Sequence, residues 1–173
     1  SSTIVITACG GLSEEMLKAK FTEFADSIKE RNPQKIETVF IKNAEKIRYF
    51  KDEMDVNQAK LVIGLRSGME NADDSYFPFR VMTDIFGGGP YSRLFLNVRE
   101  KMSLCYYCRS LINQRNGIMI VASGIEFENK EIAKNAIIAQ LEAIKNAEIT
   151  EEEFESAKKS IKNGYMQVYD GAE

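Results

Sequence analysis

The first third of the chain carries two kinds of hydrophobic pattern. Residues 4–7 are a β-branched run and residues 46–54 alternate apolar with polar positions, so both predict strands, the second half-exposed. Between them, apolar residues recur every three or four positions over residues 16–28, which predicts a helix with one buried stripe. Ser13 stands just before this helix, where an N-cap residue is expected.

The middle of the chain predicts one strand followed by two helices. Residues 59–65 are a nearly continuous apolar run, which favours a central strand. Residues 77–86 are apolar and carry Pro78 in the first turn, where a helix tolerates proline because that N–H has no intrahelical acceptor. Residues 87–90 are three glycines and a proline that interrupt the helix, and helical spacing resumes over residues 92–102.

The remainder of the chain predicts a hairpin followed by two helices. Residues 104–111 and 118–123 are strand patterns, and the Asn116-Gly117 pair between them is typical of a hairpin turn. Helical patterns follow over residues 129–145 and 151–168. Strands and helices are therefore segregated rather than strictly alternating, which predicts an α+β fold with a mainly antiparallel sheet covered by helices.

Length and composition favour one domain. The chain has 173 residues, of which 44% are hydrophobic and 28% are charged, and this is enough for one ordinary core. No repeat or low-complexity tract divides the sequence, so we expect a single domain over residues 1–173. Neither end carries a closing element, and we expect this domain to be excised from a longer chain.

Charge, histidine and cysteine content narrow the function classes. The net charge is -3 with neither sign concentrated in one half, which argues against a nucleic-acid surface. The apolar runs are far shorter than the roughly 20 residues of a membrane-spanning helix. Three cysteines in a chain of this length favour a reducing compartment, so we expect a cytoplasmic location. The chain has no histidine, and it therefore lacks the commonest metal ligand and the usual general base near neutral pH.

Cys105 and Cys108 have the spacing of a redox or zinc pair, but their surroundings favour core cysteines. A redox pair needs a helix N-terminus to lower the pKa of one thiol, whereas these residues lie in a strand pattern, where positions three apart face opposite ways. A zinc site needs four ligands, and neither histidine nor a second cysteine pair is available.

The glycine-rich break could offer backbone N–H groups to an anion, since a helix follows it. Walker and Rossmann spacings are absent, so we prefer a break whose glycines allow positive φ or close backbone approach. A ligand could use that close approach, and the possible loop contacts are Gly88, Gly89 and Ser92. The acidic groups at residues 73–74 and in the capping box of residues 150–153 are expected to be solvated or to stabilise a helix start.

Arg99 and Tyr106 are the strongest candidates for a binding function. Arg99 borders the apolar stripe of its predicted helix and Tyr106 lies early in the next strand, so a tight turn between them brings a guanidinium and a phenol together. Their N–H and O–H donors suit a substrate carbonyl or a developing oxyanion. From spacing alone, the alternative is that Arg99 is a solvated helix-end charge and Tyr106 a half-buried strand aromatic.

The stretch around these two residues resembles the M16 zinc metallopeptidases, the family of pitrilysin, insulin-degrading enzyme and the mitochondrial processing peptidase. The matching segments are GGPYSRLF (88–95), VREK (98–101) and SLCY (103–106), and DVNQ (55–58) also looks similar. The order of elements is similar over nearly the whole chain. The resemblance implies the α+β fold of the M16 and LuxS-like metallohydrolases.

In the M16 family two homologous domains face each other, and only one of them carries a His-x-x-Glu-His zinc motif. Because this chain has no histidine, it resembles the second, inactive domain, as in the zinc-motif-lacking member of paired bacterial M16 proteins. The resemblance implies that zinc lies in a partner domain of the same chain or in a partner subunit. It also implies that Arg99 and Tyr106 bind peptide substrate and polarise its carbonyl, with either Tyr106 or Tyr107 facing the site.

On this interpretation the chain alone is not an enzyme, whereas its parent or complex is a zinc peptidase. Two other functions stay open. A non-enzymatic assembly or scaffold module could keep the M16 fold, bind a partner through apolar helix faces or a sheet edge, and dispense with Arg99 and Tyr106. A free-standing ligand-binding domain could use the glycine-rich break. We expect neither a nucleic-acid nor a membrane partner.

Overall fold

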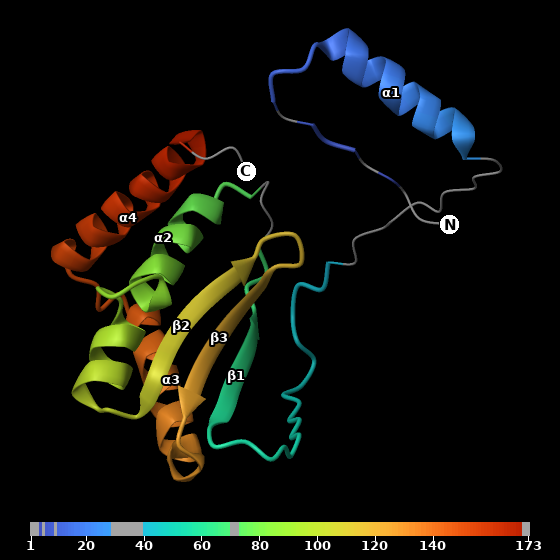
Figure 1. Ribbon diagram of the computed structural model, residues 1–173. Helices are drawn as coiled ribbons and strands as arrows, with labels where there is room; N and C mark the ends of the chain where they lie inside the picture. The colour runs from blue at the N-terminus through green and yellow to red at the C-terminus, as the bar shows by residue number, and fades with distance from the viewer. Residues whose placement is uncertain (1–3, 5, 9, 29–39, 70–72, 171–173) are drawn as a thin grey trace.

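A three-stranded antiparallel sheet lies beside a layer of helices in the computed structural model of the chain (Figure 1). The strands are ordered β1-β3-β2, and their bounds are Ala59–Arg66 for β1, Cys105–Asn113 for β2 and Ile118–Ile125 for β3. The structure describes residues 4, 6–8, 10–28, 40–69 and 73–170. The predicted α+β class with an antiparallel sheet is confirmed.

The hairpin of β2 and β3 forms where the sequence predicts it. Asn113 pairs with Ile118, and Gly117 in the turn has a φ of 58°, a left-handed conformation that favours glycine. The predicted centre of the sheet was wrong, because among the strands that the structure describes β3 rather than β1 is flanked on both sides. β1 alternates between half-buried and exposed side chains, and Val62 is 62% exposed. Only one face of this apolar strand is covered.

Four helical segments follow the first strand. They are α2 (Tyr76–Gly87), the π-helix η1 (Leu94–Lys101), α3 (Lys130–Lys145) and α4 (Glu151–Asp170), with a single 3-10 turn, η2 (Phe127–Asn129), before α3. In η1 the backbone N–H groups reach one residue further than in an α-helix, and the N–H of Met102 donates to the carbonyl of Asn97 at 3.0 Å. None of the helices that the structure describes is long and apolar enough to cross a membrane.

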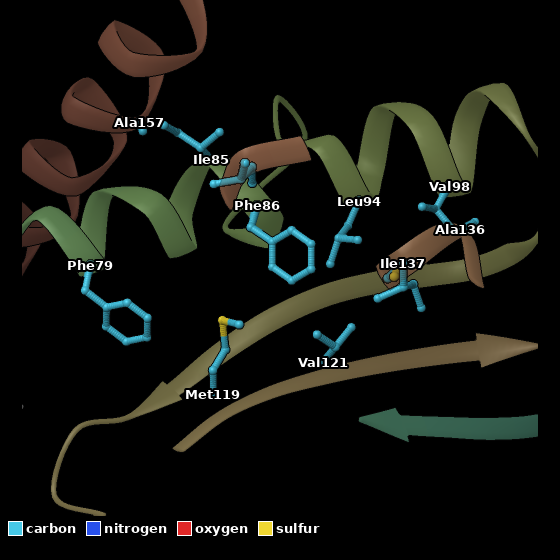
Figure 2. Close-up of a cluster of buried hydrophobic side chains, with 12 residues drawn as sticks. Phe79, Ile85, Phe86, Leu94, Val98, Met119, Val121, Ala136, Ile137 and Ala157 are labelled. Carbon is cyan, nitrogen blue, oxygen red and sulfur yellow. The ribbon is translucent and has the colours of Figure 1, made fainter. Parts of the chain in front are cut away.

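The core lies between the sheet and these helices (Figure 2). Its fully buried side chains come from several elements that are distant in sequence, and they include Phe86, Leu94, Val98, Val121 and Ile137. α4 packs on α2, and its Ala157 is also fully buried. Burial of each large apolar side chain contributes about 1.5–3 kcal/mol to the free energy of folding, so this cluster holds η1 and the hairpin together.

The N-terminal region differs from its prediction. A helix forms over α1 (Glu14–Ser27), and the Ser13 hydroxyl caps it by accepting the N–H of Met16 at 3.3 Å. The predicted buried stripe is wrong, because α1 buries no residue and Phe24 is 47% exposed. Figure 1 shows α1 lying apart from the sheet, so its apolar side chains have no surface to cover there.

Neither strand predicted in this region is formed by the described residues. Residues 4, 6 and 7 have no regular structure, and Val5 lies outside the described part of the chain. Residues 46–54 are irregular and exposed, with Tyr49 at 80% and Phe50 at 88% exposure. Alternation alone is not sufficient for a strand, because a strand also needs a neighbour to bond its backbone N–H and C=O groups.

Candidate functional site: the pocket of Arg99 and Tyr106

An open pocket of about 370 Å³ lies where η1 ends and β2 begins. It is lined by Arg99, Glu100, Ser103, Leu104, Cys105, Tyr106 and Glu126. The two residues that the sequence singles out, Arg99 and Tyr106, therefore share one cavity.

A tight turn between η1 and β2 brings these two residues together. Ser103 has a φ of 51°, in the left-handed region, and it reverses the chain directly after Met102. The N–H of Leu104 then donates to the carbonyl of Val98 at 3.1 Å. With Val98 in the core and the turn bonded back onto η1, the spacing of seven residues places the last turn of η1 beside the start of β2.

The Arg99 guanidinium is held at the rim of the pocket by three neighbours. Its centre lies 4.5 Å above the ring of Phe95, its Nε donates to the carbonyl oxygen of Tyr106 at 2.8 Å, and its Nη1 lies 3.3 Å from the carboxylate of Glu100. The side chain is 37% exposed. A cation stacked on an aromatic face and bonded through Nε is oriented while still in contact with solvent.

Tyr106 occupies a β-bulge. Cys105 pairs with Ile125 and Tyr107 pairs with Gly124, so Tyr106 is an extra residue without a partner in β3. Tyr106 and Tyr107 are both exposed, whereas Cys105 and Cys108 on either side of them are more buried. The phenol O–H donates to the carboxylate of Glu126, and Tyr106 is 54% exposed. Bulges commonly re-aim a side chain next to a functional site.

Tyr107 does not share this pocket. A Cβ at Gly124 would lie 2.6 Å from Cε1 of Tyr107, so the tyrosine ring covers the glycine on its neighbouring strand. Of the two adjacent tyrosines, Tyr106 is thus the one that accompanies Arg99.

Glu126 is a pocket residue that the sequence reasoning missed. It follows the last residue of β3, and its carboxylate accepts the phenol O–H of Tyr106. A signal for it did exist, because continuing the pairing of the predicted hairpin past its end brings the residues after β3 beside the first residues of β2. The carboxylate would also attract a cationic group that enters the pocket.

The glycine-rich break lies elsewhere in the structure. Gly88 ends α2 through its N–H, which donates to the carbonyl of Asp84 at 2.9 Å, and the Gly89 carbonyl accepts the N–H of Ser92 at 3.0 Å. A Cβ on Gly87 would lie 2.5 Å from the backbone nitrogen of Ser110, so close approach to β2 explains that glycine. Ser92 is only 1% exposed. None of these residues lines the Arg99 pocket, and their role as loop contacts stays a prediction.

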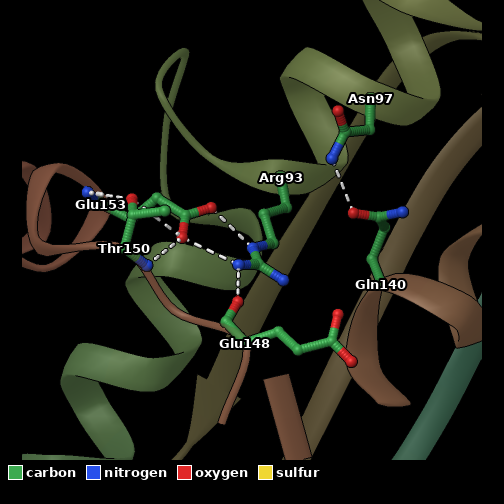
Figure 3. Close-up of polar contacts among 6 residues, drawn as sticks. All are labelled: Arg93, Asn97, Gln140, Glu148, Thr150 and Glu153. Atoms are coloured by element: carbon green, nitrogen blue, oxygen red, sulfur yellow. Dashed lines mark hydrogen bonds and ion pairs between the residues drawn. The ribbon is translucent and has the colours of Figure 1, made fainter. Parts of the chain in front are cut away.

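Arg93 of the matched SRLF segment holds the fold together (Figure 3). Its Nε and Nη2 donate to the two carboxylate oxygens of Glu153 at 2.6 and 2.8 Å, and Nη2 also donates to the carbonyl of Glu148. The hydrogen bond from Arg93 lowers the pKa of Glu153 below its usual value and raises the pKa of Arg93. This network ties the start of η1 to the start of α4.

The same carboxylate completes the predicted capping box. Glu153 accepts the backbone N–H of Thr150 at 2.9 Å, while the Thr150 hydroxyl accepts the N–H of Glu153 at 3.2 Å. A second link lies nearby, where the amide of Asn97 donates to Gln140 at 2.6 Å (Figure 3). These contacts fix η1 against α3 and α4, and thereby the helix that carries Arg99.

The two cysteines of β2 lie on the same side of the sheet. The expectation that Cys105 and Cys108 face opposite ways is wrong, because the bulge at Tyr106 restores both to the core side of the sheet, opposite Ile125 and Ser123. Both thiols are free. Cys108 is 5% exposed and belongs to the core, whereas Cys105 is half-buried and lines the pocket.

The described residues do not offer a donor set that suits a zinc ion. Among the residues that the structure describes, no group of three or more histidine, cysteine, aspartate or glutamate side chains could hold a metal ion. The chain also contains no histidine.

Comparison with known proteins assigns the family. The model of the peptidase M16 inactive domain matches residues 1–161, so the chain belongs to the M16 peptidase family as an inactive-type domain. A relative from Bacillus subtilis (strain 168), described as a probable inactive metalloprotease YmfF, is 41% identical over 121 residues. That match covers 70% of this chain but 28% of the relative, so the chain spans under a third of the relative's length.

Solved structures agree on the fold. A conserved protein from Enterococcus faecalis V583 superposes with a TM-score of 0.70 at 32% identity, covering 93% of this chain and 38% of that one. A peptidase M16 inactive domain from Pseudomonas fluorescens superposes with a TM-score of 0.66 at 20% identity, covering 90% of this chain and 38% of that one. The second likeness supports the fold alone.

Proposed function

We propose that this chain is the substrate-binding clamp of an M16-type zinc peptidase whose zinc site lies in another domain or subunit. One observation carries the proposal: the guanidinium of Arg99 and the phenol of Tyr106 line a single solvent-open pocket. Membership in the inactive-domain branch of the family supports it, since an inactive domain needs a catalytic partner to take part in hydrolysis.

The pocket supplies hydrogen-bond donors to a peptide carbonyl. Arg99 is permanently charged, and its guanidinium carries Nη donors beyond the Nε that bonds to the Tyr106 carbonyl. The Tyr106 phenol bonds to Glu126 and can exchange that acceptor for a substrate carbonyl without moving far. Donors placed beside a carbonyl stabilise the negative charge that develops on its oxygen during hydrolysis.

Substitution of the two donors tests the proposal. In the parent protein purified with its partner chains, Arg99→Ala and Tyr106→Phe are each expected to lower kcat/KM about 10- to 100-fold, because removal of one oxyanion donor has effects of this size or larger. A quenched-fluorescence peptide library provides the substrate. The melting temperature should be nearly unchanged, since both side chains lie at the pocket rim rather than in the core.

Two control variants distinguish a specific loss of substrate binding from a loss of folding. Tyr107→Phe removes a phenol from the adjacent residue outside the pocket, and Arg109→Ala removes an exposed cation from the same strand. Both control variants should keep their turnover within about two-fold. Unchanged turnover in both Arg99→Ala and Tyr106→Phe would show that these residues are not the clamp.

A scaffold function is the second candidate. It is favoured by the internal partners that Arg99 and Tyr106 already have, and by a relative that is itself described as probably inactive. One preparation distinguishes the two functions. The parent protein is purified from its native cell with an affinity tag, the chains that bind to it are identified, and its zinc content is measured. Zinc together with a chain that carries a His-x-x-Glu-His motif supports the clamp. Zinc-free material without such a chain supports the scaffold.

A further inference from the structure

We propose that Cys105 and Cys108 form a peroxide-oxidisable dithiol beside the pocket, in which Cys105 reacts first and Cys108 closes a disulfide onto it. The inference goes beyond the proposed function, because it rests on the two thiols and on no peptidase activity.

The β-bulge creates the pair. In a regular strand two residues three apart project to opposite faces. Here the extra residue Tyr106 shifts the register, so that Cys105 lies opposite Ile125 and Cys108 opposite Ser123, on the same side of the sheet. The two thiols lie near enough for each to shift the pKa of the other, and the Ser123 hydroxyl acts on both.

The two thiols differ in their access to solvent. Cys105 is half-buried and contributes to the wall of the pocket, so a small oxidant can reach its sulfur. Cys108 is only 5% exposed and packs within the core, where it is protected from direct attack. The arrangement thus pairs one accessible sulfur with one sheltered sulfur.

The two thiols also differ in acidity. The Cys108 thiol, the Ser123 hydroxyl and the Arg99 cation together lower the pKa of Cys105 to about 7, against the opposing effect of burial. The same thiol pair and burial raise the pKa of Cys108. Because the thiolate is the reactive form, Cys105 is the nucleophile near neutral pH and Cys108 stays protonated.

The reaction balances with hydrogen peroxide as the oxidant. The Cys105 thiolate attacks one peroxide oxygen, the O–O bond breaks, and the hydroxide that leaves takes a proton to form water. The sulfur of Cys108 then attacks the Cys105 sulfenic acid, the S–O bond breaks, and the departing hydroxide takes the Cys108 proton to form a second water. Two thiols and one peroxide become one disulfide and two waters. A thiol reductant reverses the disulfide.

Peptide mass spectrometry gives a direct test. Trypsin cleaves after Lys101 and Arg109, so both cysteines fall in one peptide, residues 102–109. The full parent protein is treated with micromolar hydrogen peroxide, its remaining thiols are alkylated, and it is digested. We expect this peptide to become unalkylated and lighter by two hydrogen atoms, and to regain both alkylation sites after treatment with dithiothreitol.

The rate and two variants assign the roles of the sulfurs. Oxidation should proceed about three-fold or more faster than that of glutathione at pH 7, because a larger fraction of Cys105 is thiolate. Its rate should rise as the pH passes through about 7 and then level off. Cys108→Ser should leave a sulfenic acid on Cys105 that dimedone traps, and Cys105→Ser should leave nothing to trap at Cys108.

Three results would overturn the dithiol. One is a peptide that keeps both alkylation sites at peroxide concentrations that oxidise glutathione. A second is a disulfide that joins either residue to Cys9 instead. The third is dimedone labelling of Cys108 rather than Cys105. The first two are read on the unsubstituted protein, so they do not depend on either variant folding.

Discussion

The helices α1 and α3 have similar amphipathic patterns but different environments. α3 buries Ala133, Ala136, Ile137 and Ile144, whereas α1 buries no residue. α3 follows the central strand through one 3-10 turn and therefore lies directly against the sheet. The comparison shows that a hydrophobic stripe determines the local helix, while burial requires a second surface within reach.

The same difference in burial separates the part of the chain from β1 onward from the described residues before β1. Residues 59–69 and 73–170 form a sheet, a core and a layer of helices around β3. The described residues before β1 leave several large apolar side chains exposed, among them Leu12, Met16, Tyr49 and Phe50. Three pairs of matched substitutions test whether the two regions differ in energy as they do in burial.

The largest contrast concerns the core. Phe86→Ala, which removes a fully buried ring, is expected to reduce the free energy of unfolding by about 3–5 kcal/mol. Phe24→Ala in α1 should change it by about 0.5 kcal/mol or less, because this ring is already half-exposed. Urea unfolding of the 173-residue chain measures both values. Equal losses would mean that α1 packs against the rest of the chain in solution.

The second contrast concerns ion pairs. Glu153→Gln replaces the carboxylate that bonds to Arg93 and Thr150 with a neutral amide. We expect it to reduce the free energy of unfolding by about 2 kcal/mol. Glu14→Gln removes the exposed pair with Lys18 on α1, worth about 0.3–0.5 kcal/mol at most. Differential scanning calorimetry compares the two variants. A similar small effect from both would show that the Arg93 network does not stabilise the fold.

The pH dependence of stability sharpens this contrast. Because the hydrogen bond from Arg93 lowers the pKa of Glu153, the folded chain binds this proton less tightly than the unfolded chain does. The stabilisation is therefore present above the ordinary carboxyl value of 4.5 and is lost as the pH falls through the lowered pKa. Glu153→Gln should lack this part of the acid sensitivity. If the unsubstituted chain and Glu153→Gln lost stability equally as the pH falls, the pKa of Glu153 would not contribute to acid sensitivity.

The smallest contrast concerns helix caps. Thr150→Ala removes the hydroxyl that caps α4 and should reduce the free energy of unfolding by about 1 kcal/mol. Ser13→Ala removes the equivalent hydroxyl from α1 and should fray that helix without shifting the unfolding midpoint of the core. Circular dichroism follows the helix, and a buried-core probe follows the midpoint. A midpoint shift from Ser13→Ala would show that α1 unfolds together with the sheet.

Features fixed by neighbouring residues were predictable from the sequence. The turn at Gly117, the capping box at Thr150 and the break at Gly88 each depend on a few adjacent positions, and each forms where it was expected. The turn that brings Arg99 and Tyr106 to one pocket is also short. Local chemistry of this kind leaves a signal in sequence order.

Features that depend on distant partners were not predictable in the same way. β1 is as apolar as a central strand, and only the strand order shows that it lies at an edge of the sheet formed by the described residues. The bulge at Tyr106 inserts one residue into a pattern that otherwise alternates, and nothing in its own residues marks that position. This is why the sequence argument placed the two cysteines on opposite faces and left the choice between Tyr106 and Tyr107 open.

The bulge also governs how this domain can change through evolution. Deleting the single codon for Tyr106 would leave Cys105 opposite Ile125 and Tyr107 opposite Gly124, which is the pairing they already have. The strand would lose its irregularity while every core residue kept its place. One deletion thus removes the phenol from the pocket and leaves the core contacts intact, so the chemistry of this surface can change in one mutational step without repacking the interior.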